Sequence, residues 1–130
     1  MNESVFVLTK NGKKVTYETG KEKDKVMEIV LKDIKVIGEL ISSPEKIKIF
    51  LKVHEQTKPN EHNYISGYRL SRSVSLSISA VYSFLEKMVN YGVFERPSQI
   101  NDIKWVRITE YGNYIYEKIK SISPKLSEIL

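Results

Sequence analysis

Arginine has the most uneven distribution of any residue type in this chain. Its guanidinium group offers a planar fork of N–H donors, which suits phosphate oxygens better than the single ammonium of lysine does. Lysines occur along the whole sequence, whereas the arginines are confined to one stretch and are Arg69, Arg72, Arg96 and Arg107. This clustering favours a partner that carries phosphates. The alternative is that the arginines form local ion pairs with Glu86, Glu95 or Asp102.

A row of hydroxyl groups follows the first two arginines. Ser77 is a good helix N-cap, and behind it apolar residues recur at steps of three and four, namely Ile78, Val81, Leu85 and Met88. This spacing predicts a buried stripe on a helix over about 77–91, which ends at Gly92. Small polar groups and one aromatic hydroxyl are expected on the opposite face: Ser79, Tyr82, Ser83, Glu86, Lys87 and Asn90. Such a face is suited to hydrogen bonds with base edges in a DNA groove.

A shorter helix is expected just before this one. Ser66 occupies an N-cap position, and Ile65 and Leu70 have the spacing of a hydrophobic staple. Leu70 and Val74 are then expected to share one helical face. Two short helices joined by a tight turn are typical of a helix-turn-helix. The rival interpretation is a strand, since apolar residues alternate with serines here, but Arg72 interrupts that alternation and beyond it the helical period prevails.

Two β-prone segments follow, at 93–96 and 104–108, and they predict a hairpin, or wing, with residues 97–103 as its tip. Trp105 is expected to fold back onto the core, because a tryptophan in a short strand more often packs than stays exposed. Thr109 then caps a last long helix. Its apolar stripe includes a tyrosine-rich surface that is a second candidate for a dimer seam and consists of Tyr111, Tyr114, Ile115 and Ile119.

The first eighteen residues predict another hairpin, from Ser4 to Glu18. Asn11-Gly12 supplies the positive φ angles of a two-residue type I′ turn, which sets a register in which Leu8 faces Val15 and Phe6 faces Tyr17. The lysines at its tip, Lys10, Lys13 and Lys14, are interpreted as a solvated turn rather than as a DNA contact.

The longest apolar stripe belongs to the next segment. Thr19 and Glu22 have capping-box spacing, and a helix of some 22 residues from there to about residue 41 is about 33 Å long. Its stripe comprises Val26, Ile29, Val30, Ile34, Ile37, Leu40 and Ile41. A small helical domain cannot cover so long a stripe, so part of it is expected to bind a second copy of the chain, through Val30, Ile34, Ile37 and Ile41. Gly38 indicates either a close backbone contact or a tolerated interior glycine, and Ser43-Pro44 begins a further helix.

These elements resemble winged helix-turn-helix regulators of the MarR, PadR and archaeal Lrp-like kinds. The matching positions lie between about Pro44 and Ser121 and are Leu70, Val74, Leu76, Ser77, Val81, Leu85, Met88, Gly92, Phe94 and Arg96. Ile108, Thr109, Glu110 and Gly112 resemble the Leu-Thr-x-x-Gly that follows the wing in those proteins. The resemblance implies a mainly α fold with β-hairpins (α+β), in which a winged helix-turn-helix domain over 43–122 lies between an added N-terminal hairpin and long helix over 1–42 and a C-terminal turn over 123–130.

The same resemblance implies that the helix over 77–91 enters the major groove while the wing over 93–108 meets the backbone or the minor groove. The residues expected to contact double-stranded DNA are Arg69, Arg72, Ser77, Ser79, Tyr82, Ser83, Lys87, Arg96 and Lys104. The chain is therefore expected to be a sequence-specific transcriptional regulator. The alternative is a winged-helix protein–protein docking module in transcription, replication or DNA-segregation machinery.

Composition agrees with a nucleic-acid partner and argues against several other classes. A chain of 130 residues with a net charge of +5 is sized for one domain and modestly favours a polyanion. The absence of cysteine and of any long apolar run predicts a cytoplasmic protein without a membrane partner. No nucleophile or phosphate-loop motif indicates an enzyme or a cofactor, and His54 and His62 lack companions at metal-ligand spacing, so no metal site is expected.

Overall fold

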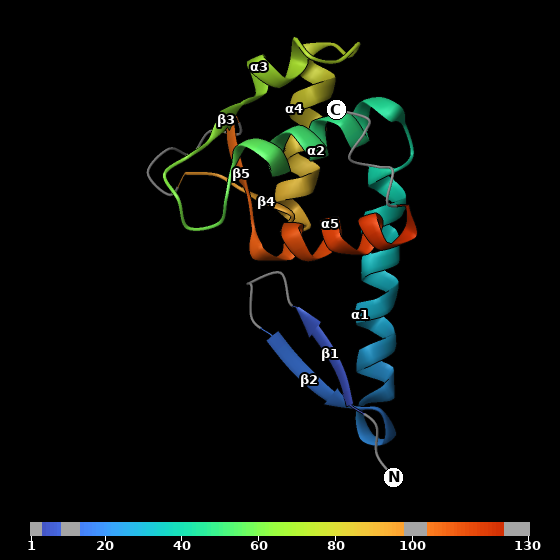
Figure 1. Cartoon of the computed structure of the whole chain (residues 1–130). Helices are drawn as coiled ribbons and strands as arrows, with labels where there is room; N and C mark the ends of the chain where they lie inside the picture. Colours follow the sequence, from blue (N-terminus) through green and yellow to red (C-terminus); the bar gives the residue numbers. More distant parts are fainter. Residues whose placement is uncertain (1–3, 9–13, 98–103, 124–130) are drawn as a thin grey trace.

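One long helix carries a smaller helical domain on its C-terminal half and a β-hairpin beside its N-terminal half (Figure 1). The structure is a computed structural model that describes residues 4–8, 14–97 and 104–123. Its helices are α1 (Thr19–Leu40), α2 (Pro44–Gln56), α3 (Gly67–Ser71), α4 (Ile78–Asn90) and α5 (Glu110–Ile122). Its strands are β1 (Ser4–Leu8), β2 (Lys14–Glu18), β3 (Ile65–Ser66), β4 (Phe94–Glu95) and β5 (Trp105–Ile108). The expected α+β class, dominated by helices, is confirmed.

Hydroxyl side chains begin the helices of the domain, as the sequence predicts. Each accepts a hydrogen bond from a backbone N–H in the first turn, which satisfies a donor that has no partner within the helix. The caps are Ser43 for α2, Ser66 for α3, Ser77 for α4 and Thr109 for α5. Gly92, with a φ angle of 81°, ends α4 in the left-handed region that favours glycine.

Three short strands form an antiparallel sheet beside the helices, in the order β3-β5-β4. Phe94 lies opposite Ile108, which confirms the two strands predicted for the wing, and Ile65 lies opposite Val106. The tip at 98–103, including Asn101-Asp102, lies outside the described residues. Strand β3 was not predicted, because two residues are too few to show a period.

The core lies between α2, α4, α5 and the sheet. Phe50 of α2 stacks on Phe94 of β4 with ring centroids 6.2 Å apart, and α1 contributes Val36 and Leu40, which are fully buried. Close packing against the sheet explains why the residue near the start of α5 is a glycine, Gly112. A Cβ there would lie 2.8 Å from Ile108 side-chain atoms and would overlap the carbonyl oxygen of Val93. Glycine therefore lets α5 approach the sheet.

The N-terminal hairpin is present, but its predicted register is wrong by one residue. Leu8 pairs with Lys14, and Phe6 pairs with Thr16. An odd number of residues then lies between Leu8 and Lys14, whereas a two-residue turn at Asn11-Gly12 needs an even number between paired residues. That turn, with Lys10 and Lys13, lies outside the described residues.

Two details of the predicted helix pair are also wrong. Helix α3 ends at Ser71, so Val74 lies in the turn after it, where it is partly buried against the core. Ile78 opens α4 but is 41% exposed, and Phe84 instead joins the buried stripe. The strand interpretation of this segment is wrong, since α3 and α4 are helices. Of the C-terminal turn over 123–130, only Ser123 is described.

Candidate nucleic-acid interface

The solvent face of α4 carries small polar and charged side chains, as predicted, and Ile78 at the start of the helix is exposed as well. Ser77, Ser79 and Ser83 are all exposed, and the Ser77 and Ser79 hydroxyl oxygens lie 3.2 Å apart, within hydrogen-bond distance. Val81, Leu85 and Met88 on the opposite face are buried. The packing of that apolar face therefore determines which hydroxyls face solvent.

Tyr82 differs from its serine neighbours because its ring is part of the protein's own packing. A Cβ at Gly67 would lie 2.8 Å from Cδ1 of Tyr82 and 3.1 Å from Cδ1 of Leu85, so the tyrosine ring fills the space that a side chain at Gly67 would need. The residue is half-buried against the core. Tyr82 thus positions α4 against the start of α3, and only its exposed part remains for a base contact.

Two exposed arginines lie on and just after α3. Arg69 is in the last turn of the helix, and Arg72 is its C-cap residue. The Arg72 guanidinium carbon lies 5.9 Å from the ring centroid of Tyr68, which is itself 57% exposed. Exposed guanidinium groups beside an aromatic ring can bind phosphate and stack on a base.

The residue before β5 lies beside the start of α3. The backbone N–H of Gly67 donates a hydrogen bond to the carbonyl oxygen of Lys104 at 2.6 Å, and Ser66 is the cross-strand partner of Trp105. The backbone of Lys104 therefore lies next to the first residue of α3, although the two residues are far apart in the sequence. Arg96, just after β4, is also exposed.

Trp105 is 43% exposed, so the expectation that it folds back onto the core is wrong. Side chains alternate along a strand, and the buried residues of β5 are Val106 and Ile108. Burying those two residues leaves Trp105 on the solvent side of the sheet.

Lys87 and Arg107 are engaged in ion pairs within the protein. Lys87 Nζ lies 3.1 Å from Oε1 of Glu39, which also accepts from Lys46 at 3.0 Å, and hydrogen bonds from these lysines lower the pKa of Glu39. Arg107 Nε lies 2.5 Å from Oε1 of Glu95, so the ion-pair alternative holds for this arginine. Its guanidinium also donates to the Glu61 carbonyl oxygen and lies 4.8 Å from the Tyr64 ring centroid.

The residues expected to form a dimer contact differ in their exposure to solvent. Val30, Ile34 and Ile41 are 39%, 59% and 57% exposed, whereas Ile37 is partly buried against the core. Met27 and Leu31 are exposed as well and were not predicted.

The tyrosine-rich surface of α5 is not a free seam. The Tyr111 hydroxyl donates to Oδ1 of Asp33 at 2.6 Å, and the Tyr114 hydroxyl donates to Oδ2 at 2.8 Å. Desolvation by burial, followed by these bonds to Asp33, raises the pKa of both tyrosines well above their ordinary value. These side chains fasten α5 to α1 instead of facing a partner.

Within the described ranges, no group of three or more His, Cys, Asp or Glu side chains is arranged to hold a metal ion. The helices found there are all too short or too polar to cross a bilayer. A scan against protein-family models and searches of curated proteins and of solved structures found no match to this chain.

Proposed function

We propose that the protein is a winged helix-turn-helix domain that binds double-stranded DNA sequence-specifically and regulates transcription. The order of elements from α2 to α5, with β3 between the first two helices and the β4–β5 pair after the third, supports this assignment. In such a domain α4 is the recognition helix and β4–β5 form the wing.

The observation that carries the proposal is that DNA-suited groups lie on α3, on the adjacent α4 and at the residue before β5, whose backbone hydrogen-bonds to the start of α3. The hydroxyl face of α4 starts at the Ser77 cap, Arg69 and Arg72 lie at the end of the preceding helix, and the Gly67–Lys104 hydrogen bond joins Lys104 to the first residue of α3. Ser79 and Ser83 are in position to meet base edges, while the arginines and Lys104 meet phosphates.

The experiment is a titration of duplex DNA at several salt concentrations, read by fluorescence anisotropy. Each neutralised phosphate contributes about 0.9 to the slope of log K against log salt, so binding is expected to weaken steeply as salt is added. Arg69→Ala and Arg96→Ala should each lower that slope by about one unit and weaken binding to all sequences. Equal, negligible binding at low and moderate salt would refute the proposal.

Loss of a base contact and loss of a phosphate contact are expected to have different effects on DNA affinity. Ser79→Ala and Ser83→Ala should weaken binding to the selected sequence by about 1 to 3 kcal/mol and leave binding to unrelated DNA nearly unchanged. If they reduce both in the same proportion, α4 does not read bases.

A protein–protein docking module is the second candidate, and one observation favours it. Ile78 and Tyr68 are 41% and 57% exposed on the α3–α4 side, while Lys87 is paired with Glu39. Apolar groups and a neutralised lysine there suit a protein partner. Absence of DNA binding in the salt titration is the result that would favour this candidate.

A further inference from the structure

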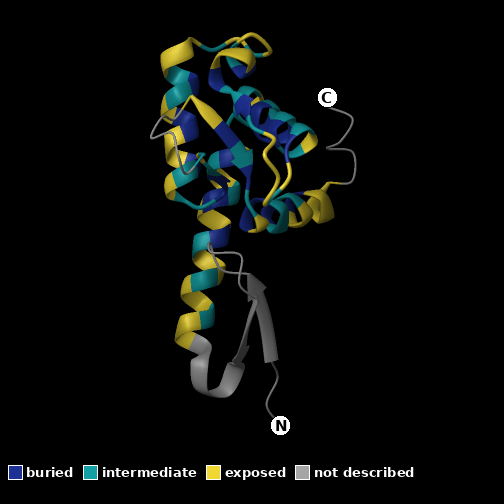
Figure 2. Cartoon of the chain, turned by 90° about the vertical axis from the view of Figure 1, so that its left-hand side faces the viewer, coloured by how far each residue is buried: buried dark blue, intermediate teal, exposed yellow. Residues whose placement is uncertain are grey.

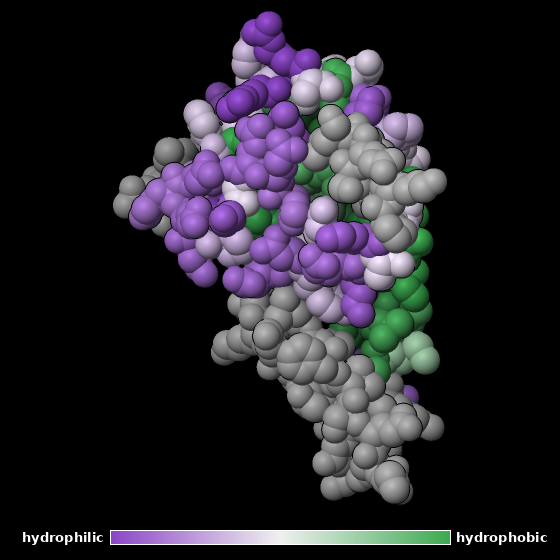
Figure 3. Space-filling model, in the orientation of Figure 1, coloured by the Kyte–Doolittle hydropathy of each residue, from purple (hydrophilic) through white to green (hydrophobic). Residues whose placement is uncertain are grey.

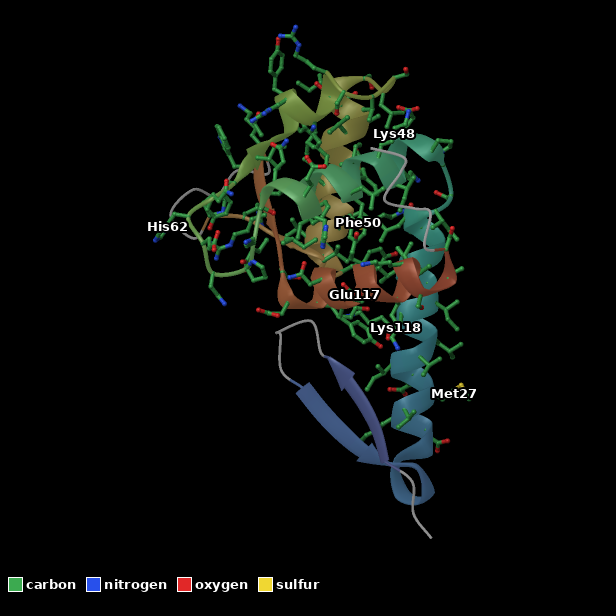
Figure 4. The ribbon with its side chains drawn as sticks, in the orientation of Figure 1. Met27, Lys48, Phe50, His62, Glu117 and Lys118 are labelled. Atoms are coloured by element: carbon green, nitrogen blue, oxygen red, sulfur yellow. The ribbon has the colours of Figure 1, made fainter. Side chains whose placement is uncertain are left out.

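Helix α1 has two apolar faces, and the domain covers only one of them. Val36 and Leu40 point into the core, together with the carboxylate of Asp33. Met27, Leu31, Ile34 and Ile41 are each between 57% and 59% exposed. Figure 3 shows this side of α1 as a continuous hydrophobic strip, and Met27 in Figure 4 points away from the rest of the protein. Figure 2 shows no buried residue in α1 between residues 24 and 32, the part described before Asp33.

The exposed apolar residues follow a heptad pattern. Met27, Leu31, Ile34, Gly38 and Ile41 are separated by steps of four, three, four and three. At 3.6 residues per turn they lie, with Val30, within an arc of about 100°, the shape of a coiled-coil seam. Gly38 belongs to this arc, and a Cβ there would meet no atom within 4 Å. The chain's own fold therefore does not require glycine at that position.

We infer that this seam, defined by Met27, Leu31, Ile34, Gly38 and Ile41, binds the same seam of a second copy, with the two α1 helices antiparallel. The interface is additional to the proposed DNA contacts and shares no residue with them. A 4-3 repeat is self-complementary, since each apolar side chain fits between those of an identical helix. Exposed apolar patches of this kind on a polar protein usually mark contacts with other chains.

The antiparallel arrangement follows from size and charge. It places Gly38 opposite the long, flexible Met27 of the partner subunit, whereas a parallel pair would set glycine against glycine and leave a gap in the seam. Glu28 and Lys35 lie on the same edge of the seam and have opposite charges. In the antiparallel pair with Leu31 facing the partner's Ile34, each Glu28 lies near the partner's Lys35, so the pair is attractive on both sides of the two-fold axis.

The first experiment measures the mass of the protein in solution by light scattering, without DNA. The wild-type chain at micromolar concentration should have twice the 15.1 kDa mass of one chain. Ile34→Glu and Leu31→Lys should give monomers with unchanged circular dichroism, because both side chains are already exposed within one chain. Ile122→Glu is the matched control, since Ile122 is a 72% exposed isoleucine off the seam, and it should remain dimeric. A monomeric wild type, or a dimer that survives both seam substitutions, would overturn the inference.

The second experiment tests the orientation. The chain has no cysteine, so cysteines can be placed singly. Mixed Met27→Cys and Gly38→Cys chains should be joined by a short thiol cross-linker, while neither variant alone should cross-link efficiently. Efficient cross-linking of each variant with itself would contradict the antiparallel arrangement. Because no DNA is present, neither experiment depends on the proposed function.

Discussion

At the scale of single residues, Glu39 decides whether Lys87 is available to a phosphate. Its carboxylate holds Lys87 at 3.1 Å and Lys46 at 3.0 Å. We expect Glu39→Gln to release Lys87 and to increase the salt slope of DNA binding by up to about 0.9, with tighter binding at low salt. Glu117→Gln, which removes the same charge from an exposed position on α5, is the control. An effect no larger than that of the control would show that Lys87 does not reach DNA.

Trp105 is the only tryptophan and therefore reports on strand β5, the second strand of the proposed wing, without labelling. Because its side chain is 43% exposed beside Lys104, we expect duplex DNA to quench or shift its emission, and added salt to reverse the change. The measurement is a fluorescence titration run in parallel with anisotropy of labelled DNA. Binding seen by anisotropy with unchanged tryptophan emission would place the wing outside the contact.

His54 is expected to make the stability of the protein depend on pH. The ring of His54 stacks on Tyr116 with centroids 3.5 Å apart, and desolvation by burial lowers the pKa of His54 below its ordinary 6.5, with Glu117 opposing this. The folded protein thus favours neutral His54, and the unfolded chain binds more protons just below pH 6.5. His54 therefore causes stability to fall as the pH drops below 6.5 towards the folded-state pKa, and not above 6.5.

This effect is measured by urea unfolding above and below that pH. His54→Gln should lessen the loss of stability on acidification. His62, in the loop before β3, is exposed (Figure 4), so His62→Gln should behave like the wild type. If the two substitutions give the same pH dependence, burial of His54 does not contribute.

At the scale of elements, a buried carboxylate fastens the long helix to the last one. Asp33 is 9% exposed and accepts hydrogen bonds from Tyr111 and Tyr114. Tyr111→Phe removes one donor from a buried carboxylate, so we expect the free energy of unfolding to fall by about 1 to 3 kcal/mol. Urea denaturation at neutral pH measures it.

The control for that experiment is Tyr116→Phe on the same helix. Tyr116 contacts His54 and Phe50 through its ring, which phenylalanine keeps. Tyr116→Phe should therefore lower the free energy of unfolding by less than Tyr111→Phe does. Equal costs would mean that the hydroxyl bonds to Asp33 do not stabilise the α1–α5 contact.

At the scale of the whole molecule, the two proposals together predict the shape of the DNA site. A two-fold dimer presents two recognition helices, so sequences selected from random DNA should contain two inverted half-sites whose centres are about 10 base pairs, or a multiple of that, apart. Ile34→Glu should retain binding to one half-site and lose the dependence on their spacing. A single asymmetric site for the dimeric wild type would contradict this combination, while leaving each proposal open to its own test.

The sequence by itself determined the elements that depend on neighbouring residues. Ser66, Ser77 and Thr109 were identified as caps because a cap acts on an N–H three residues away, and the hydroxyl face of α4 follows from a period of 3.6. Gly92 was likewise assigned from its place after the last helical residue. These parts of the fold, and the exposure of the serines on α4, were predicted correctly because their causes lie within one or two turns of helix.

Tertiary structure decided which of the apolar residues are buried and which of the charged residues form ion pairs. Helix α1 offers apolar residues on two faces, and only contact with α2 and α5 selected Val36 and Leu40 for the core and left Ile34 exposed. The pairing of Lys87 with Glu39 joins residues 48 positions apart, which no local pattern reveals. Trp105 is exposed for the same reason, since α2 and α5 pack against β5 and bury the alternate side chains, Val106 and Ile108. Periodicity identifies apolar faces, but only the neighbours brought together by folding determine which face is covered.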